Sequence, residues 1–270
     1  MKGVILAGGK GLRLYPLTKV TNKHLLPVGR EPMIYNPLRK LIEAGIKDIL
    51  IVTSTDQMGS IVNLLGSGAE FDCNLTYKVQ EKPAGIAQAL SLAEDFAHGK
   101  KIVVILGDNI TTGSIKPYVD EFKQQQKGAK VLLKKVNDPH RYGVAAIDES
   151  QVIEIEEKPH HPKSNFAVVG YYMYDGSVFD VMRSLNPSDR GEYEITDVNN
   201  EYIRRGELTY GFLEGEWTDA GTFESLLLAN QLFLNDSPQQ VQAKVSTAQL
   251  QEMISSFEEK IQELKKHFPP

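Results

Sequence analysis

The chain has 270 residues, 41% of them hydrophobic, which suits one large α/β domain or one domain with an appendage. Its 30 basic and 35 acidic residues give a formal net charge of −5, which argues against a nucleic-acid binder with a basic face. A single cysteine excludes an internal disulfide framework, and the N-terminal apolar run is too short for a membrane span or signal peptide. We therefore expect a cytoplasmic protein with neither nucleic-acid nor membrane partners.

Short β-branched segments alternate with helical patterns through the first half of the chain. We expect strands at residues 2–6, 48–52, 75–79 and 101–106, and helices around 38–46, 61–65 and 86–93. Asp56 is the expected N-cap of the second of these helices. Strands that alternate with helices build a mainly parallel sheet with helices on both faces, so the predicted fold class is α/β.

The pattern changes beyond Gly128. Strand-like segments at 129–135, 143–147, 152–156 and 167–174 follow one another with short links, which predicts that part of the sheet is antiparallel. Helices are expected around 178–185, 195–204 and 223–234, with a strand at 208–213 before the last of them.

The C-terminal tail is expected to be separate from this body. Asp236, Ser237 and Pro238 interrupt the preceding helical pattern, so we place the domain boundary between residues 1–235 and 236–270. In the tail, apolar residues recur at alternating steps of four and three, as in a heptad seam: Leu250, Ile254, Phe257, Ile261, Leu264 and Phe268. Such a helix can dock on its own domain or form an oligomer contact.

A glycine-rich loop follows the first predicted strand, with Gly8, Gly9 and Gly11 around Lys10 and Arg13 after them. Glycines let backbone N–H groups approach a phosphate closely, and an arginine adds a planar charged fork. The spacing matches neither the dinucleotide fingerprint nor the P-loop, and disfavours a dinucleotide-dependent oxidoreductase. From the loop alone, phosphate binding and a plain tight turn remain equally open.

Basic and acidic residues elsewhere extend this pattern. Lys23 follows the loop in a polar cluster that leads into an apolar pair, which suggests a lysine held near the loop, although this segment taken alone would favour an ordinary surface lysine. Asp108 stands where a buried parallel strand ends, the edge at which open α/β sheets bind ligands, and Asp219 stands at a second strand-to-helix junction. Two such aspartates suit Mg²⁺, although each could instead cap a turn or a helix.

A second candidate phosphate-binding residue, Lys158, lies near the end of the segment 152–159. Pro159 is expected to restrict Lys158 to extended backbone, so that Lys158 could present a point charge to a phosphate or simply be a surface lysine. The pair His160 and His161 lacks any zinc-ligand spacing and is expected in an exposed loop.

Taken together, the ordered motifs resemble the sugar nucleotidylyltransferase family, and its glucose-1-phosphate thymidylyltransferases in particular. The motifs are GVILAGGKGLRL at 3–14, Lys23 with the Leu-Pro pair at 26–27, VQEKPAGIAQA at 79–89, LGDN at 106–109, RYGV at 141–144, EEKP at 156–159, KSN at 163–165, RGE at 190–192, EITD at 194–197 and WTDAG at 217–221. The resemblance covers roughly residues 1–235 and implies a Rossmann-like mixed, mainly parallel sheet flanked by helices.

The resemblance also implies roles for individual residues. Leu6, Gly8, Gly9, Gly11 and Arg13 would hold the triphosphate, Gln80 and Gly85 would read the thymine edge, and Lys23 would neutralise the phosphates. Asp108 and Asp219 would hold Mg²⁺, with Trp217 behind them. The sugar-phosphate side would comprise Asn109, Gly143, Glu157, Lys158, Val168 and Arg190.

The implied reaction is direct displacement between dTTP and glucose 1-phosphate, giving dTDP-glucose and pyrophosphate in a homo-oligomeric enzyme. The tail does not match the C-terminal region that forms a regulatory nucleotide site in longer family members. Alternatives are a uridylyl- or cytidylyltransferase acting on a related sugar phosphate, and a non-catalytic nucleotide-sugar sensor. A sensor would not need to retain the metal ligands together with every basic group.

Overall fold

A computed structural model describes residues 1–234, and the predicted tail at 236–270 lies outside the described residues. The strands are β1 Lys2–Ala7, β2 Pro27–Val28, β3 Glu31–Pro32, β4 Asp48–Ser54, β5 Asn74–Gln80, β6 Ile102–Leu106, β7 Asn109–Thr111, β8 Ala129–Lys135, β9 Gly143–Asp148, β10 Gln151–Glu157, β11 Phe166–Tyr174, β12 Leu208–Phe212 and β13 Trp217–Asp219. The helices are α1 Tyr35–Glu43, α2 Met58–Leu65, α3 Ile86–Ser91, α4 Glu94–Ala97, α5 Lys116–Gln124, α6 Val178–Arg183, α7 Ile195–Arg204 and α8 Phe223–Leu234. None of the described helices is long and apolar enough to cross a membrane.

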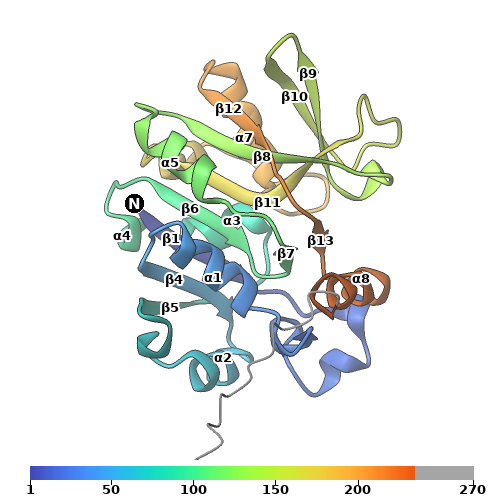
Figure 1. Cartoon of the computed structure of the whole chain (residues 1–270). Helices are drawn as coiled ribbons and strands as arrows, with labels where there is room; N and C mark the ends of the chain where they lie inside the picture. Colours follow the sequence, from blue (N-terminus) through green and yellow to red (C-terminus); the bar gives the residue numbers. More distant parts are fainter. Residues whose placement is uncertain (235–270) are drawn as a thin grey trace, which may run out of the picture. The chain divides into compact units, whose positions relative to one another are not determined.

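One mixed sheet of nine strands organises the described part of the chain (Figure 1). Strands β6, β1, β4 and β5 are parallel neighbours, as the first half of the sequence predicts. Strand β11 joins this parallel part to an antiparallel part, because it runs antiparallel to β6, β8 and β9. The predicted α/β class with a partly antiparallel sheet is confirmed.

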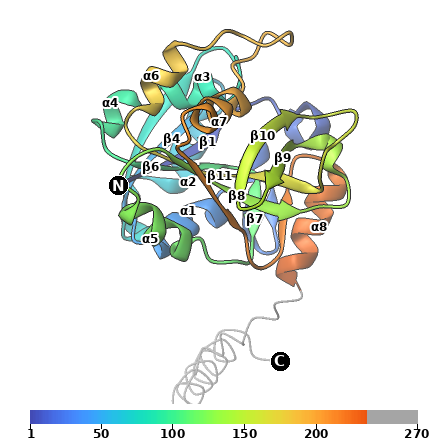
Figure 2. The same ribbon diagram turned by 90° about the horizontal axis from the view of Figure 1, so that it is seen from above.

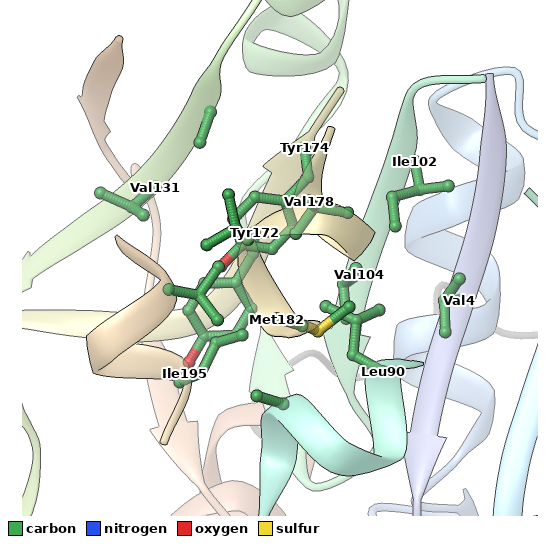
Figure 3. Packing of buried hydrophobic residues seen from close by; sticks show 14 of the residues in the cluster. Val4, Leu90, Ile102, Val104, Val131, Tyr172, Tyr174, Val178, Met182 and Ile195 are labelled. Carbon is green, nitrogen blue, oxygen red and sulfur yellow. The ribbon is translucent and has the colours of Figure 1, made fainter. Parts of the chain in front are cut away.

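Helices cover both faces of the sheet because successive strand residues point to opposite sides. In β1, Val4 packs in the cluster that contains residues of α3, α6 and α7 (Figures 2 and 3). Its neighbour Ile5 packs in the other cluster, with residues of α1, α2 and α5. Each fully buried aliphatic side chain of this kind stabilises the fold by about 1.5–3 kcal/mol.

Local predictions hold for most of the described elements, but one cap was wrong. Helix α2 begins after Gln57, and no side chain caps its N-terminus, so Asp56 does not perform the predicted N-cap role. Helix α5 and the short antiparallel pair of β7 with β13 are additional elements that the periodicity did not reveal. The β7–β13 pair matters for the site described below.

Candidate active site

Two adjoining hollows lie at the carboxyl ends of the parallel strands. The first, named here the glycine-loop hollow, has a volume of about 250 Å³ and is lined by seven of the predicted residues: Leu6, Gly8, Gly9, Lys23, Gln80, Gly85 and Asp108. The second, named the carboxylate hollow, measures about 260 Å³ and is lined by eight: Arg13, Asp108, Asn109, Gly143, Glu157, Lys158, Val168 and Asp219. Asp108 belongs to both walls, so the two hollows adjoin at this carboxylate.

The glycine loop takes the backbone geometry that its composition predicts. Gly9 and Gly11 have φ values of 92° and 61°, which side chains disfavour. Gly11 does not line either hollow, because it packs against the neighbouring chain: a Cβ there would lie 2.8 Å from Thr18 and 3.2 Å from Lys23. Gly11 therefore supports the position of Lys23 rather than offering an open surface.

A short capped turn holds Lys23 in place. The side chain of Asn22 accepts a hydrogen bond of 2.8 Å from the backbone N–H of His24, at the start of the 3₁₀ helix Lys23–Leu25. Lys23 Nζ then pairs with Asp108 Oδ2 at 2.6 Å. The expectation that this lysine is held near the glycine loop is confirmed.

The buried side chain of His24 packs against Gly107, the residue before Asp108. Its ring is buried and so close to Gly107 that a Cβ on Gly107 would lie 2.7 Å from it. Burial, reinforced by the charge of Lys23, lowers the pKa of His24 to about 3, so the ring is neutral at pH 7. Burial alone would raise the pKa of Asp108, but the charge and hydrogen bond of Lys23 outweigh it and hold that pKa well below its usual value.

The β7–β13 pair brings the two predicted aspartates together. Its register sets Asp219 opposite Asn109, and the N–H of Ala220 donates to the carbonyl of Asp108 at 2.8 Å. Burial raises the pKa of Asp219, and the negative charge of Asp108 adds to the increase although Arg141 opposes it. Two carboxylates therefore face one hollow with their like charges close enough to interact.

This donor set fits a hard divalent cation. Mg²⁺ in phosphate-transfer sites is held by one or two carboxylates and completes its shell with phosphate oxygens and water. Within residues 1–234 no cluster of three or more histidine, cysteine or carboxylate side chains could enclose a metal by itself. Asp108 and Asp219 are thus the residues that could hold Mg²⁺ together with a phosphate ligand.

Sequence reasoning assigned no role to Arg141 and Tyr142, although both lie in the RYGV motif. Arg141 Nη2 donates to both carboxylate oxygens of Asp219 at 3.1 Å, and Tyr142 Oη donates to Oδ1 at 3.0 Å. In this structure both aspartates are thus neutralised by a basic side chain, Asp108 by Lys23 and Asp219 by Arg141.

Asn109 lines the carboxylate hollow, yet its amide is occupied by the protein. Its Oδ1 accepts hydrogen bonds of 2.9 Å from the N–H of Gly170 and from the indole of Trp217, and its Nδ2 donates to Asp108 at 3.1 Å. Trp217 is nearly buried and packs edge-on against Tyr142. Asn109 therefore ties β7 to β11 and β13 behind the two carboxylates.

The predicted sugar-phosphate residues separate into two groups. Glu157 and Lys158 line the carboxylate hollow, and Glu157 Oε2 accepts from Thr196 Oγ1 at 2.6 Å. Arg190 lines neither hollow; its guanidinium pairs with Glu194 at 2.7 Å and reaches Glu157 at 3.4 Å.

The predicted backbone of Lys158 was wrong. Its φ is +46°, in the left-handed region, rather than the extended geometry that a following proline favours. The N–H of Lys158 donates to the carbonyl of Tyr142 at 2.9 Å, so a bond from another segment overrides the local preference. His160 and His161 are exposed, as expected.

Arg13 is an exposed cation beside the second aspartate. Its guanidinium would lie 3.1 Å from a Cβ on Gly221, two residues beyond Asp219. Among the described residues it forms no ion pair within 4.0 Å. The charge of Arg13 is therefore available to an anion in the carboxylate hollow.

Gln80 and Gly85 also line the glycine-loop hollow. Gly85 has φ 99°, and a Cβ there would lie 2.5 Å from the backbone oxygen of Tyr193, so only glycine fits. Tyr193 holds this loop by donating from its N–H to Ala84 at 2.9 Å and accepting from the N–H of Ala87 at 3.1 Å. Gln80 is 6% exposed and ends β5.

Comparison with known proteins finds similar nucleotidyl transferases. The family model described as nucleotidyl transferase matches residues 2–236. A glucose-1-phosphate thymidylyltransferase of Xanthomonas campestris pv. campestris is 47% identical over 229 residues, covering 83% of this chain and 78% of the relative. One of Neisseria meningitidis is 44% identical over 230 residues, covering 84% and 80%.

Solved structures agree with these relatives. A Bacillus anthracis protein, described as a candidate glucose-1-phosphate thymidylyltransferase and crystallised with sucrose, is 57% identical with a TM-score of 0.85; the match covers 89% of this chain and 98% of that one. A UDP-glucose pyrophosphorylase bound to UDP-glucose shares the fold at a TM-score of 0.78 and 24% identity, covering 87% and 98%.

Proposed function

The chain belongs to the nucleotidyl transferase family, and we propose that it acts as a glucose-1-phosphate thymidylyltransferase. The enzyme transfers the thymidylyl group of dTTP to α-D-glucose 1-phosphate and yields dTDP-glucose and pyrophosphate. The observation that carries the proposal is the pair of adjoining hollows that share Asp108, one beside the glycine loop and one beside Lys158. We also propose that the reaction takes place in the cytoplasm.

The two hollows suit the two substrates. The glycine loop and Gln80 suit a nucleoside triphosphate, while the hollow lined by Glu157, Lys158 and Val168 suits a sugar phosphate. A phosphate oxygen of glucose 1-phosphate attacks the α-phosphorus of dTTP, and the bond from that phosphorus to the bridging oxygen of pyrophosphate breaks. No protein nucleophile is needed, because the acceptor is already an anion; a trapped covalent nucleotidyl-enzyme would refute this route.

Catalysis then consists of positioning and charge stabilisation. Bound Mg²⁺ would neutralise phosphate charge at Asp108 and Asp219, the two carboxylates whose donor set fits it. Lys23 and Arg141, which pair with these carboxylates in this structure, are the basic groups that would balance phosphate charge beside them. Arg13 stabilises charge that develops on the reacting phosphate, and Lys158 orients the attacking sugar phosphate.

Pyrophosphate release tests this function directly. With glucose 1-phosphate and Mg²⁺, we expect rapid release from dTTP and slower release from UTP, CTP, ATP and GTP measured in parallel. A preference for UTP or CTP would keep the enzyme class and replace the donor. Clear ligand binding without turnover of any donor, tried also with other sugar phosphates, would support a nucleotide-sugar sensor instead.

The catalytic body is proposed to end at residue 235. Among residues 1–234, those that line the two hollows all fall in the range from Leu6 to Asp219. We therefore expect a chain truncated before Ser237 to keep kcat and the KM for dTTP within about twofold, because it retains every described residue that lines either hollow. Loss of dTTP binding on truncation would show that this boundary is misplaced.

We also propose a homo-oligomer. Apolar side chains stand exposed after the glycine loop, with Leu12 at 75% and Val20 at 88% exposure, and Leu227 on α8 at 61%. Light scattering measures the oligomeric state of the full chain and of the chain truncated before Ser237. An oligomer that persists after truncation is formed by residues 1–236, and one that is lost requires the tail. A monomeric full chain would contradict the proposal.

A further inference from the structure

The side chain of Gln80 is held in one orientation by a second glutamine. Gln80 Nε2 donates to Gln88 Oε1 at 2.7 Å and, more weakly, to the carbonyl oxygen of Gly85 at 3.5 Å. Gln88 is the third residue of α3, in the first turn of that helix, and it does not line the glycine-loop hollow. Gln88 belongs to α3 and Gly85 is its N-cap residue, so the nitrogen of the Gln80 amide faces the start of α3.

The oxygen of the same amide therefore faces the glycine loop. A Cβ on Gly8 would lie 2.9 Å from Gln80 Oε1, closer than any other atom within 4 Å. No donor among residues 1–234 bonds to this oxygen, although Gln80 is only 6% exposed. The group that Gln80 presents to the glycine-loop hollow is thus a hydrogen-bond acceptor.

The orientation has chemical consequences because a glutamine amide has nearly the same shape when reversed. Thymine and uracil carry a donor, N3–H, in the middle of the pairing edge, whereas cytosine carries an acceptor at N3 and a donor at N4. An amide oxygen that lies opposite N3 accepts from the N3–H of the first two bases and repels the N3 acceptor of the third. A reversed amide would do the opposite, with no change in the size of the pocket.

We propose that Gln88 is a positioning residue that holds the oxygen of Gln80 toward the base and thereby sets the preference for thymine and uracil donors over cytosine donors. This inference rests on the proposed function, in which the glycine-loop hollow takes the nucleoside triphosphate. Gln88 can serve in this way because α3 is anchored at its start, where Tyr193 bonds to Ala84 and Ala87.

The sharpest test compares dUTP with dCTP, which share the same sugar and differ only at the pairing edge. We expect the wild-type chain to favour dUTP in kcat/KM by about 100-fold or more, as sites that bond a specific donor do. Gln88→Met keeps the length but removes the acceptor, so the preference should fall by about tenfold. Gln88→Lys supplies a donor that recruits the Gln80 oxygen, and should shift the ratio furthest toward dCTP.

Gln88→Glu is the matched control. Its carboxylate still accepts from Gln80 Nε2, and its charge acts equally on both triphosphates, so the ratio should stay within about threefold of wild type. Both donors are measured on one preparation, so a fraction of unfolded protein cancels from the ratio. If Gln88→Met does not fold, the Lys and Glu variants still make opposite predictions.

The outcomes separate this inference from the function on which it rests. A wild-type chain without preference for dUTP over dCTP would contradict the donor assignment itself, whatever Gln88 does. A wild-type preference that persists unchanged in Gln88→Met and Gln88→Lys would overturn the role of Gln88 alone. Loss of preference in Gln88→Glu as large as in Gln88→Met would assign the effect to packing, and would also overturn it.

Discussion

Asp108→Asn is expected to lower kcat by about 10³-fold while the protein remains folded. Asp108 lines both hollows and is the carboxylate at which the two proposed substrates meet. The amide keeps the size of the side chain but removes the negative charge that would hold Mg²⁺, and leaves the charge of Lys23 without its partner at 2.6 Å. Turnover at saturating dTTP and glucose 1-phosphate measures the loss.

Two further readouts tie this loss to the metal. The affinity for Mn²⁺ in the presence of dTTP, followed by the signal of the free ion, should fall together with kcat. The variant should still unfold cooperatively, at a lower melting temperature because Lys23 loses its partner. Asp72→Asn is the matched control, since that carboxylate is 87% exposed and, within residues 1–234, pairs only with Lys47. Near-normal turnover and Mn²⁺ affinity in Asp108→Asn would remove Asp108 from the metal site.

Arg13→Gln should lower kcat by about 10²–10³-fold with a smaller change in the KM for glucose 1-phosphate. The guanidinium of Arg13 is exposed and lies beside Gly221, and it forms no ion pair with any described residue, so its removal breaks no ion pair of this part of the chain. The loss would then report charge stabilisation of the reacting phosphate. Arg13→Lys should recover only part of the rate, because an ammonium lacks the planar fork that binds two oxygens.

An arginine on α7 provides the control for the loss of positive charge in Arg13→Gln. Arg204→Gln removes an arginine that is 70% exposed and bonded to Glu201, remote from both hollows, and should leave kcat unchanged. If Arg13→Gln raised only the KM for dTTP and left kcat intact, Arg13 would bind the ground state rather than the reacting phosphate.

The β7–β13 pair illustrates what lay beyond sequence reasoning. Asp108 and Asp219 could each be suggested as metal ligands because each stands at the end of a strand-like segment. Their meeting depends on the register of two three-residue strands, which carry too little periodicity to be paired from sequence. Arg141 and Tyr142 were visible in a motif, but their contact with Asp219 follows from the same pairing.

The sequence by itself determined the α/β class, the order of most strands and helices, the glycine loop and, through its ordered motifs, the family. These features are local, because a run of β-branched residues or a glycine in a tight turn restricts the chain within a few residues. Tertiary structure alone decided the rest. Lys158 adopts a positive φ because it bonds to Tyr142, and Gln80 turns its oxygen to the glycine loop because Gln88 accepts from its nitrogen. Such choices between nearly equal local states are made by partners from other elements, and no pattern along the chain records them.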